Sequence, residues 1–243
     1  MYPPKFDYYR ADSVTEALSL MKQHSGAKLL AGGHSLIPAM NLRLADPGTL
    51  IDIGRIESLR GITATRDGGC RIGALTPHAD VAKSDLVPTG LSEAASMIGD
   101  PQVRNRGTVG GNIAHADPAS DLPTVMTALN ATIHLTGENG DRDVAAADFF
   151  IDLFMTDVQP GELLTAVSIP SPHPGRDFNN AAGSAYAKLF NPASRYAIVG
   201  AAAMVVVENG QCSQEKVSFV GIQIRPVDQD ERPLDVAYLY LYG

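Results

Sequence analysis

The chain has 243 residues, which is enough for one large domain or for two to three small ones. Hydrophobic residues make up 44% of the chain and charged residues 19%, which excludes disorder along its whole length. The formal net charge of −8 argues against a nucleic-acid partner. Two cysteines, Cys70 and Cys212, are too few for a disulfide scaffold, a four-cysteine zinc site or an iron–sulfur cluster bound by this chain alone.

No secretory or membrane-spanning pattern occurs in the sequence. The N-terminal residues lack an apolar core of the signal-peptide type. The longest apolar stretch, Ala197 to Val207, is too short to cross a bilayer as a helix. We therefore expect a cytoplasmic protein that does not insert into a membrane, with both cysteines as free thiols.

The first part of the chain, residues 1–55, has the pattern of a small unit of alternating helices and strands. Ser13 is a candidate N-cap, with Glu16 three residues later, and an apolar stripe follows at helical spacing. The predicted elements are a helix that starts at Ser13, a strand at 28–31, a helix at 37–44 and a strand at 49–53.

The second part, residues 56–175, mixes helices and strands around one long polar segment. The predicted elements are a strand at 71–75, helices at 78–84 and 91–97, a loop at 99–120, a helix at 122–129 and strands at 131–136 and 163–169. Asn139-Gly140-Asp141 indicates a turn, and the Pro-rich residues 170–175 are typical of a linker.

The third part, residues 176–243, is dominated by predicted strands. A strand is expected at 184–190, and strands at 198–207 and 216–224 are joined by a turn that contains Asn209-Gly210. The tail from Val227 to Gly243 shows no helix cap.

Two glycine-containing segments, 30–36 and 107–112, are the main candidates for a binding site. Paired glycines let backbone N–H groups converge on an anion, and a helix after the first segment adds a favourable dipole. Together they could clamp a pyrophosphate from both sides. The alternative is a pair of tight turns. Neither segment matches the Rossmann or P-loop fingerprint.

Other polar residues near these segments have alternative roles. Asp117 and Asp121 could bind ribityl or ribose hydroxyls, whereas the structural alternative is an Asx turn at Asp117 and a helix cap at Asp121. His34 and His115 show no metal-binding spacing, so no metal is assigned. The sequence shows no Ser-His-Asp order or nucleophile elbow.

The segments AGGHSLIP at 31–38 and GTVGGN at 107–112, with ADPASDLP at 116–123, closely resemble the two flavin-binding loops of a known family. That family is the FAD-binding (medium) subunit of the molybdenum hydroxylases, a group that includes aerobic carbon monoxide dehydrogenase and bacterial xanthine dehydrogenase-type enzymes. Residues 6–8 and 191–197 are also similar, and the resemblance covers about residues 1–220.

The resemblance implies an α+β fold: a two-subdomain FAD-binding fold of the PCMH type, followed by a small α+β C-terminal subdomain. The expected boundaries are 1–55, 56–175 and 176–243. The family usually continues after about residue 221 with a strand, a turn and a helical segment, and this tail departs from that pattern. We therefore expect an incomplete or divergent third subdomain.

The resemblance also implies a set of FAD-binding residues. Residues 31–35 would hold the pyrophosphate, 108–112 would hold it from the other side, Asp121 would reach ribityl or ribose hydroxyls, and Tyr196 would pack near the flavin ring. The alternative for Tyr196 is a core tyrosine. The full predicted set is Ala31, Gly32, Gly33, His34, Ser35, Leu36, Thr108, Val109, Gly110, Gly111, Asn112, Asp121 and Tyr196.

The implied function is electron transfer within a larger oxidoreductase. FAD would receive electrons from [2Fe–2S] clusters on a small partner subunit, the molybdenum cofactor would lie on a large one, and an external acceptor such as a quinone, NAD⁺ or O₂ would be reduced. No catalytic side chain is assigned to this chain. The alternatives are a self-sufficient flavoenzyme of the same architecture, such as an alcohol oxidase or an enolpyruvyl reductase, and a non-catalytic remnant.

Overall fold

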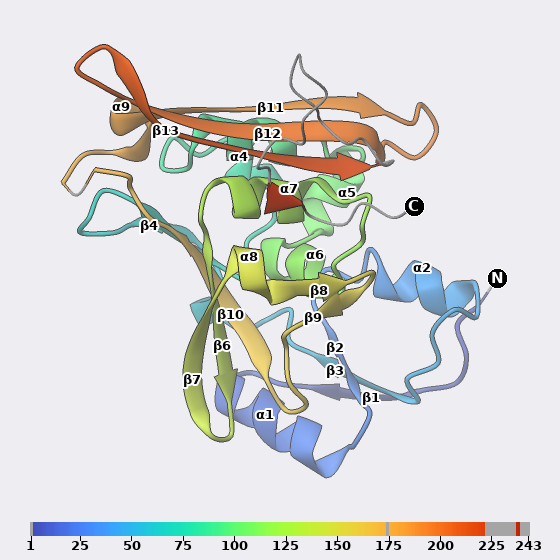
Figure 1. Cartoon of the computed structure of the whole chain (residues 1–243). Coiled ribbons are helices and arrows are strands. Elements are labelled where there is room, and N and C mark those ends of the chain that lie inside the picture. Colours follow the sequence, from blue (N-terminus) through green and yellow to red (C-terminus); the bar gives the residue numbers. More distant parts are fainter. Residues whose placement is uncertain (1, 174, 222–236, 239–243) are drawn as a thin grey trace.

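The computed structural model describes residues 2–173, 175–221 and 237–238. Three main sheets succeed one another along the chain and lie at the bottom, the centre and the top of Figure 1. The predicted α+β class is confirmed. Within the described residues, the helices are all too short or too polar to cross a membrane.

The first sheet is parallel, with the strand order β1-β3-β2. Its elements are β1 (Asp7–Arg10), α1 (Val14–Gln23), β2 (Lys28–Leu30), α2 (Leu36–Asn41) and β3 (Thr49–Asp52). The Ser13 hydroxyl accepts a hydrogen bond from the backbone N–H of Glu16 at 3.1 Å, so the predicted cap of α1 is confirmed. All four residues of β1 are exposed, so this strand has no apolar alternation and was not predicted.

The second sheet is antiparallel, with the order β4-β5-β10-β6-β7. Its strands are β4 (Ile62–Ala64), β5 (Cys70–Gly73), β6 (Thr132–Gly137), β7 (Gly140–Ala145) and β10 (Leu163–Ile169). A short hairpin lies beside it, formed by β8 (Phe150–Asp152) and β9 (Met155–Thr156). The predicted strand at 163–169 is confirmed at both ends.

Helices fill the space between the second and third sheets (Figure 1). They are α3 (His78–Val81), α4 (Thr89–Met97), α5 (Pro101–Arg106), α6 (Val109–His115), α7 (Asp121–Ala128) and α8 (Ala146–Phe149), with the 3₁₀ turn η1 (Glu57–Leu59) nearer the first sheet. Every residue of α7 is buried, because α7 packs against the third sheet and against the neighbouring helices α4, α6 and α8.

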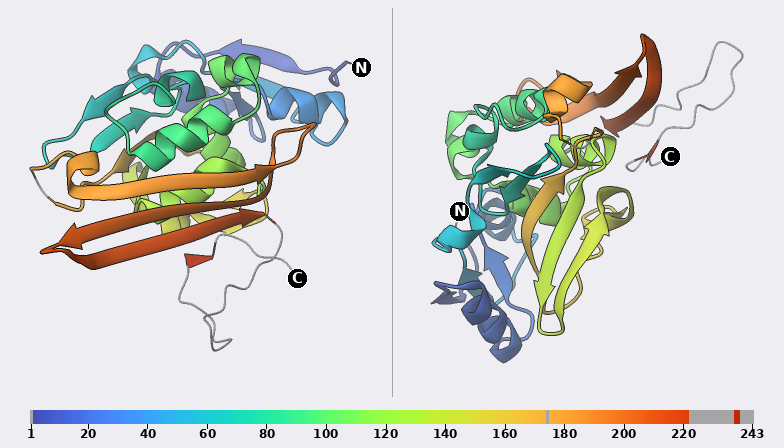
Figure 2. Two further views of the ribbon diagram at one scale, coloured as in Figure 1. Left: turned by 90° about the horizontal axis from the view of Figure 1, so that it is seen from above. Right: turned by 90° about the vertical axis from the view of Figure 1, so that its left-hand side faces the viewer.

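The third sheet has the order β11-β12-β13-β14. Its elements are α9 (Phe178–Ala181), β11 (Ala182–Phe190), β12 (Ala197–Glu208), β13 (Gln211–Gly221) and β14 (Ala237–Tyr238). Asn209 and Gly210 both have positive φ and form the predicted hairpin turn. Figure 2 shows the long curved hairpin of β12 and β13. The predicted end of this strand at 224 and most of the predicted tail lie outside the described residues.

The predicted loop at 99–120 is wrong, because it contains α5 and α6. The Asp100 carboxylate caps α5 by accepting from the Val103 N–H at 2.9 Å, and the Thr108 hydroxyl caps α6 by accepting from the Gly111 N–H at 3.2 Å. Glycine lowers helix propensity, but these caps and the surrounding packing outweigh that preference. The predicted domain boundaries stay a prediction.

Candidate cofactor-binding site

The first glycine segment follows β2 and offers a row of unused backbone donors. Gly33 has a φ of +74°, which turns the chain between β2 and α2. Within the described part of the chain, the N–H groups of residues 32–35 donate to no protein acceptor. The His34 ring folds back, with Nδ1 3.0 Å from the Gly32 carbonyl oxygen. Successive free N–H groups around such a turn fit an anionic ligand.

The second segment uses most of its donors inside the protein. The Val109 N–H donates to the Thr76 carbonyl at 3.0 Å, and the Gly110 N–H donates to the Ala74 carbonyl at 2.8 Å. Both residues are buried, whereas Gly111 and Asn112 lie nearer the surface. The binding of a pyrophosphate by residues 108–112 stays a prediction. Gly111 and Asn112 are better placed for it than Val109 and Gly110, whose N–H groups are already bonded within the protein.

The structure brings the two segments together, as a clamp requires. A Cβ added to Gly32 would overlap the Arg106 carbonyl oxygen, so the backbones of the two segments pack directly against each other there. A Cβ added to Gly111 would lie 3.7 Å from the Cβ of Ala31. The two segments therefore meet along one seam between the first sheet and α6, formed by residues 31–32 and 106–111. The unused N–H groups of residues 32–35 and the exposed end at Gly111 and Asn112 belong to the two segments that meet there.

His78 lies under this seam. Its backbone N–H donates to the Gly107 carbonyl at 3.0 Å, and a Cβ on Gly107 would lie 3.0 Å from the ring Nε2. The side chain is buried, and its Nδ1 has no hydrogen-bond partner among the described residues. Burial, with a smaller contribution from His34, lowers the pKa of His78 to about 4. The imidazole is therefore neutral near pH 7.

Asp121 begins α7 and is buried in a small polar cluster. Its Oδ1 accepts from the Tyr186 hydroxyl at 2.5 Å, and its Oδ2 accepts from the Lys188 ammonium at 2.8 Å. Burial raises the pKa of Asp121, and the bonds from Lys188 and Tyr186 act against that rise. Ser120 holds the N-cap position, so the alternative of Asp121 as the cap is wrong. Its predicted contact with sugar hydroxyls stays a prediction.

Sequence reasoning missed Tyr186 and Lys188 as members of this site. The Lys188 side chain is fully buried and also donates to the carbonyl oxygens of Met97 and Arg195. Both residues lie on β11 two positions apart, so they share one face of the strand. The available signal was a lysine two residues after a tyrosine in the strand predicted at 184–190, because that spacing places both side chains on one face.

Tyr196 lies beside the loop that precedes α7. The next residue, Ala197, donates its N–H to the Ala119 carbonyl at 3.3 Å. Tyr196 is 45% exposed, so the alternative of a core tyrosine is wrong. Partial burial, and then the charges of Asp117 and Asp121, raise the pKa of its hydroxyl. Asp117 itself closes the Asx turn expected as its alternative role, accepting from the Ala119 N–H at 2.9 Å.

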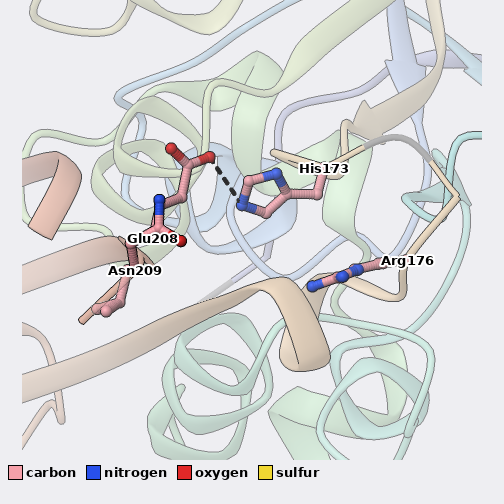
Figure 3. A pocket seen from close by; sticks show the side chains of 5 residues that line it. His173, Arg176, Glu208 and Asn209 are labelled. Atoms are coloured by element: carbon pink, nitrogen blue, oxygen red, sulfur yellow. Dashed lines mark ion pairs between the residues drawn. The ribbon is translucent and has the colours of Figure 1, made fainter. Parts of the chain in front are cut away.

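A separate polar hollow of about 470 Å³ contains none of the predicted site residues. Its lining residues are His173, Arg176, Val207, Glu208 and Asn209. Figure 3 shows the His173 ring facing Glu208, with Nε2 3.4 Å from a carboxylate oxygen. The hollow lies between the linker after β10 and the β12–β13 turn, so it does not adjoin the glycine segments.

Comparison with known proteins decides the family. Residues 4–172 match the family model described as the FAD binding domain in molybdopterin dehydrogenase. The chain belongs to the FAD-binding medium subunits of the molybdenum hydroxylases. It therefore contains an FAD-binding domain and is an oxidoreductase subunit, and the resemblance recognised in its two glycine segments is confirmed.

Named relatives extend the match beyond the FAD-binding domain. This medium subunit is 39% identical over 229 residues to the glyceraldehyde dehydrogenase medium chain of Sulfolobus acidocaldarius, covering 93% of this chain and 79% of that one. It is 41% identical over 228 residues to the carbon monoxide dehydrogenase medium chain of Hydrogenophaga pseudoflava, covering 91% and 76%. A solved structure of carbon monoxide dehydrogenase from Hydrogenophaga pseudoflava matches with a TM-score of 0.84 and 42% identity, covering 90% of this chain and 76% of that one.

Proposed function

We propose that this medium subunit passes electrons from the [2Fe–2S] clusters of a partner subunit through FAD to an external acceptor. The observation that supports this role is the row of unused N–H donors at residues 32–35, in the segment that packs against the start of α6. FAD supplies the redox chemistry when bound, and the protein supplies binding, orientation and electrostatics.

Within this proposal, each part of the site has a separate task. The N–H groups of residues 32–35 and the exposed end formed by Gly111 and Asn112 bind the pyrophosphate. Asp121 accepts hydrogen bonds from sugar hydroxyls while Lys188 and Tyr186 hold its carboxylate in place. Tyr196 presents a half-exposed ring beside Asp121 for packing near the flavin. The remaining predicted residues, Ala31, Leu36, Thr108, Val109 and Gly110, shape the backbone of the two segments.

The proposed assembly contains a large subunit with the molybdenum cofactor and a small iron–sulfur subunit. Relatives named as medium chains or medium subunits support it, because such names describe one chain of a complex. The cytoplasmic location of the complex stays a prediction.

The experiment has a cofactor arm and an assembly arm. Purified protein reconstituted with FAD should show flavin absorption, and the released cofactor should be FAD rather than FMN. Capture from a native extract should recover a large chain and a small cysteine-rich chain. Release of FMN, or no flavin uptake in excess FAD, would overturn the site. A flavin-loaded chain that turns over its own substrate without partners would instead establish the self-sufficient flavoenzyme.

A further inference from the structure

Three polar side chains form a continuous hydrogen-bonded row on the second sheet, away from the glycine segments. The His134 Nδ1 lies 2.6 Å from the Asp143 Oδ1, and the His134 Nε2 lies 2.7 Å from the Ser168 Oγ. No sequence motif indicates this arrangement. Strand pairing alone creates it, because His134 is on β6, Asp143 on β7 and Ser168 on β10.

The register places this row and an arginine on the same face of the sheet. His134 pairs with Asp143 on one side and with Ala166 on the other. Ser168 is two residues after Ala166, so it shares that face, and it pairs with Arg71 on β5. Arg71 is exposed and forms no side-chain hydrogen bond or ion pair with other described residues.

A cleft of about 610 Å³ lies along this face. It is lined by His134, Asp143 and Arg71 from the sheet and by residues 58–61 from the segment that follows the first sheet. Ser168 is half-buried and is not itself a lining residue, but it lies two residues along β10 from Ala166 and is hydrogen-bonded to His134, both of which line the cleft. The His134 side chain is 18% exposed, so the ring is held by its neighbours but remains accessible from the cleft.

We propose that Ser168, His134 and Asp143 form a hydrolytic triad that cleaves small carboxylic esters bound in this cleft. The Asp143 carboxylate accepts from Nδ1–H of His134, which leaves Nε2 as the acceptor for the Ser168 hydroxyl hydrogen. This is the relationship that activates a serine nucleophile. Arg71 supplies a positive charge next to Ser168, where the oxygen of a tetrahedral intermediate would become negative.

The reaction balances without any additional reactant except water. The Ser168 Oγ forms a bond to the ester carbonyl carbon as its proton moves to Nε2 of His134. The bond from that carbon to the alkoxy oxygen then breaks, and the departing alcohol takes the proton from Nε2. Water, deprotonated by His134, attacks the acyl-serine, and the carboxylic acid leaves as the serine is restored.

The first experiment labels the unmodified full-length protein. A fluorophosphonate probe that reacts with activated serines should modify Ser168, and peptide mass spectrometry locates the adduct. Modification only elsewhere, or none, would overturn the proposal and leave the row as a cross-strand hydrogen-bond network. Because this arm needs no variant, it decides the question even if substitutions in the sheet disturb folding.

The second experiment measures hydrolysis of p-nitrophenyl acetate. Ser168→Ala should lower the rate by about a hundredfold, the low end of the contribution of a positioned base with its nucleophile. Ser58→Ala is the matched control, because Ser58 lines the same cleft and has no imidazole partner among the described residues. Flavin content, measured alongside, should not change in either variant. Equal rates for Ser168→Ala and the unmodified protein would overturn the proposal.

Discussion

The Lys188 ammonium lies 2.8 Å from Oδ2 of Asp121 and joins the third sheet to the first residue of α7. The Lys188 side chain is fully buried, and only 6% of the Asp121 side chain is exposed. The pair therefore couples the position of a predicted cofactor ligand to the packing between α7 and β11. A charge buried without its partner is far more costly than a paired one.

We expect Asp121→Asn to destabilise the protein by about 3–5 kcal/mol, because it leaves the Lys188 ammonium buried without a countercharge. Lys188→Met should cost a similar amount by leaving the Asp121 carboxylate unpaired. Urea unfolding, followed by circular dichroism, measures both free energies. The double variant should lose much less than the sum of the two single losses. Additive losses would show that the two groups do not form a coupled pair.

Gly33→Val should weaken FAD binding by about tenfold or more, because a side chain at this positive φ costs about 1–3 kcal/mol and the turn would relax to a different conformation, which must be reversed when FAD binds. The altered turn would also displace the N–H groups of residues 32–35. The measurement is the ratio of flavin to protein after dialysis, with circular dichroism to verify folding.

The control for this variant is Gly183→Ala. Gly183 lies in β11 outside the positive-φ region, and a Cβ there would meet no atom within 4 Å. If the folded Gly33→Val variant keeps its full flavin content, this loop does not bind the cofactor.

Thr108→Val tests the cap of α6. The substitution keeps the branched shape and removes the hydroxyl that accepts from the Gly111 N–H, so we expect a loss of about 0.5–2 kcal/mol. Thermal unfolding measures that loss, and FAD titration measures whether the start of α6 still supports binding. Unchanged stability would show that the surrounding backbone hydrogen bonds hold α6 without the cap.

His78 should make the protein less stable in mild acid. Its pKa of about 4 in the folded protein lies below the ordinary value of 6.5, so between these values the unfolded chain binds the proton and the folded one does not. The free energy of unfolding is therefore not reduced by His78 above about pH 6.5, and it falls as the pH decreases from there toward 4. At pH 5 the loss should be roughly 2 kcal/mol.

His78→Leu removes the titrating group and should flatten this part of the stability curve, measured by urea unfolding at several pH values. His24→Leu is the control, because His24 stacks on Tyr9 with ring centroids 4.2 Å apart and lies outside the hydrophobic cores. An equal acid sensitivity in His78→Leu and the unmodified protein would assign the effect to other groups.

Local signals in the sequence predicted a large part of the fold. Ser13 starts α1, the apolar run at 163–169 forms β10, and Asn209-Gly210 turns the chain between β12 and β13. These features succeed because a cap, a buried strand and a two-residue turn depend on neighbouring residues. The glycine segments identified the family for a similar reason, since each is a short contiguous pattern.

Only the tertiary structure decided the features that depend on contacts between residues far apart in the sequence. The α6 helix forms through Val109 and Gly110 because the carbonyls of Thr76 and Ala74 accept their N–H groups. The Asp121–Lys188 pair joins residues 67 positions apart. The row of His134, Asp143 and Ser168 depends on the register of three strands, and a shift by one residue would turn a strand's side chains to the opposite face. A periodic pattern specifies which face of an element is buried, but only packing and register select the polar groups that meet there.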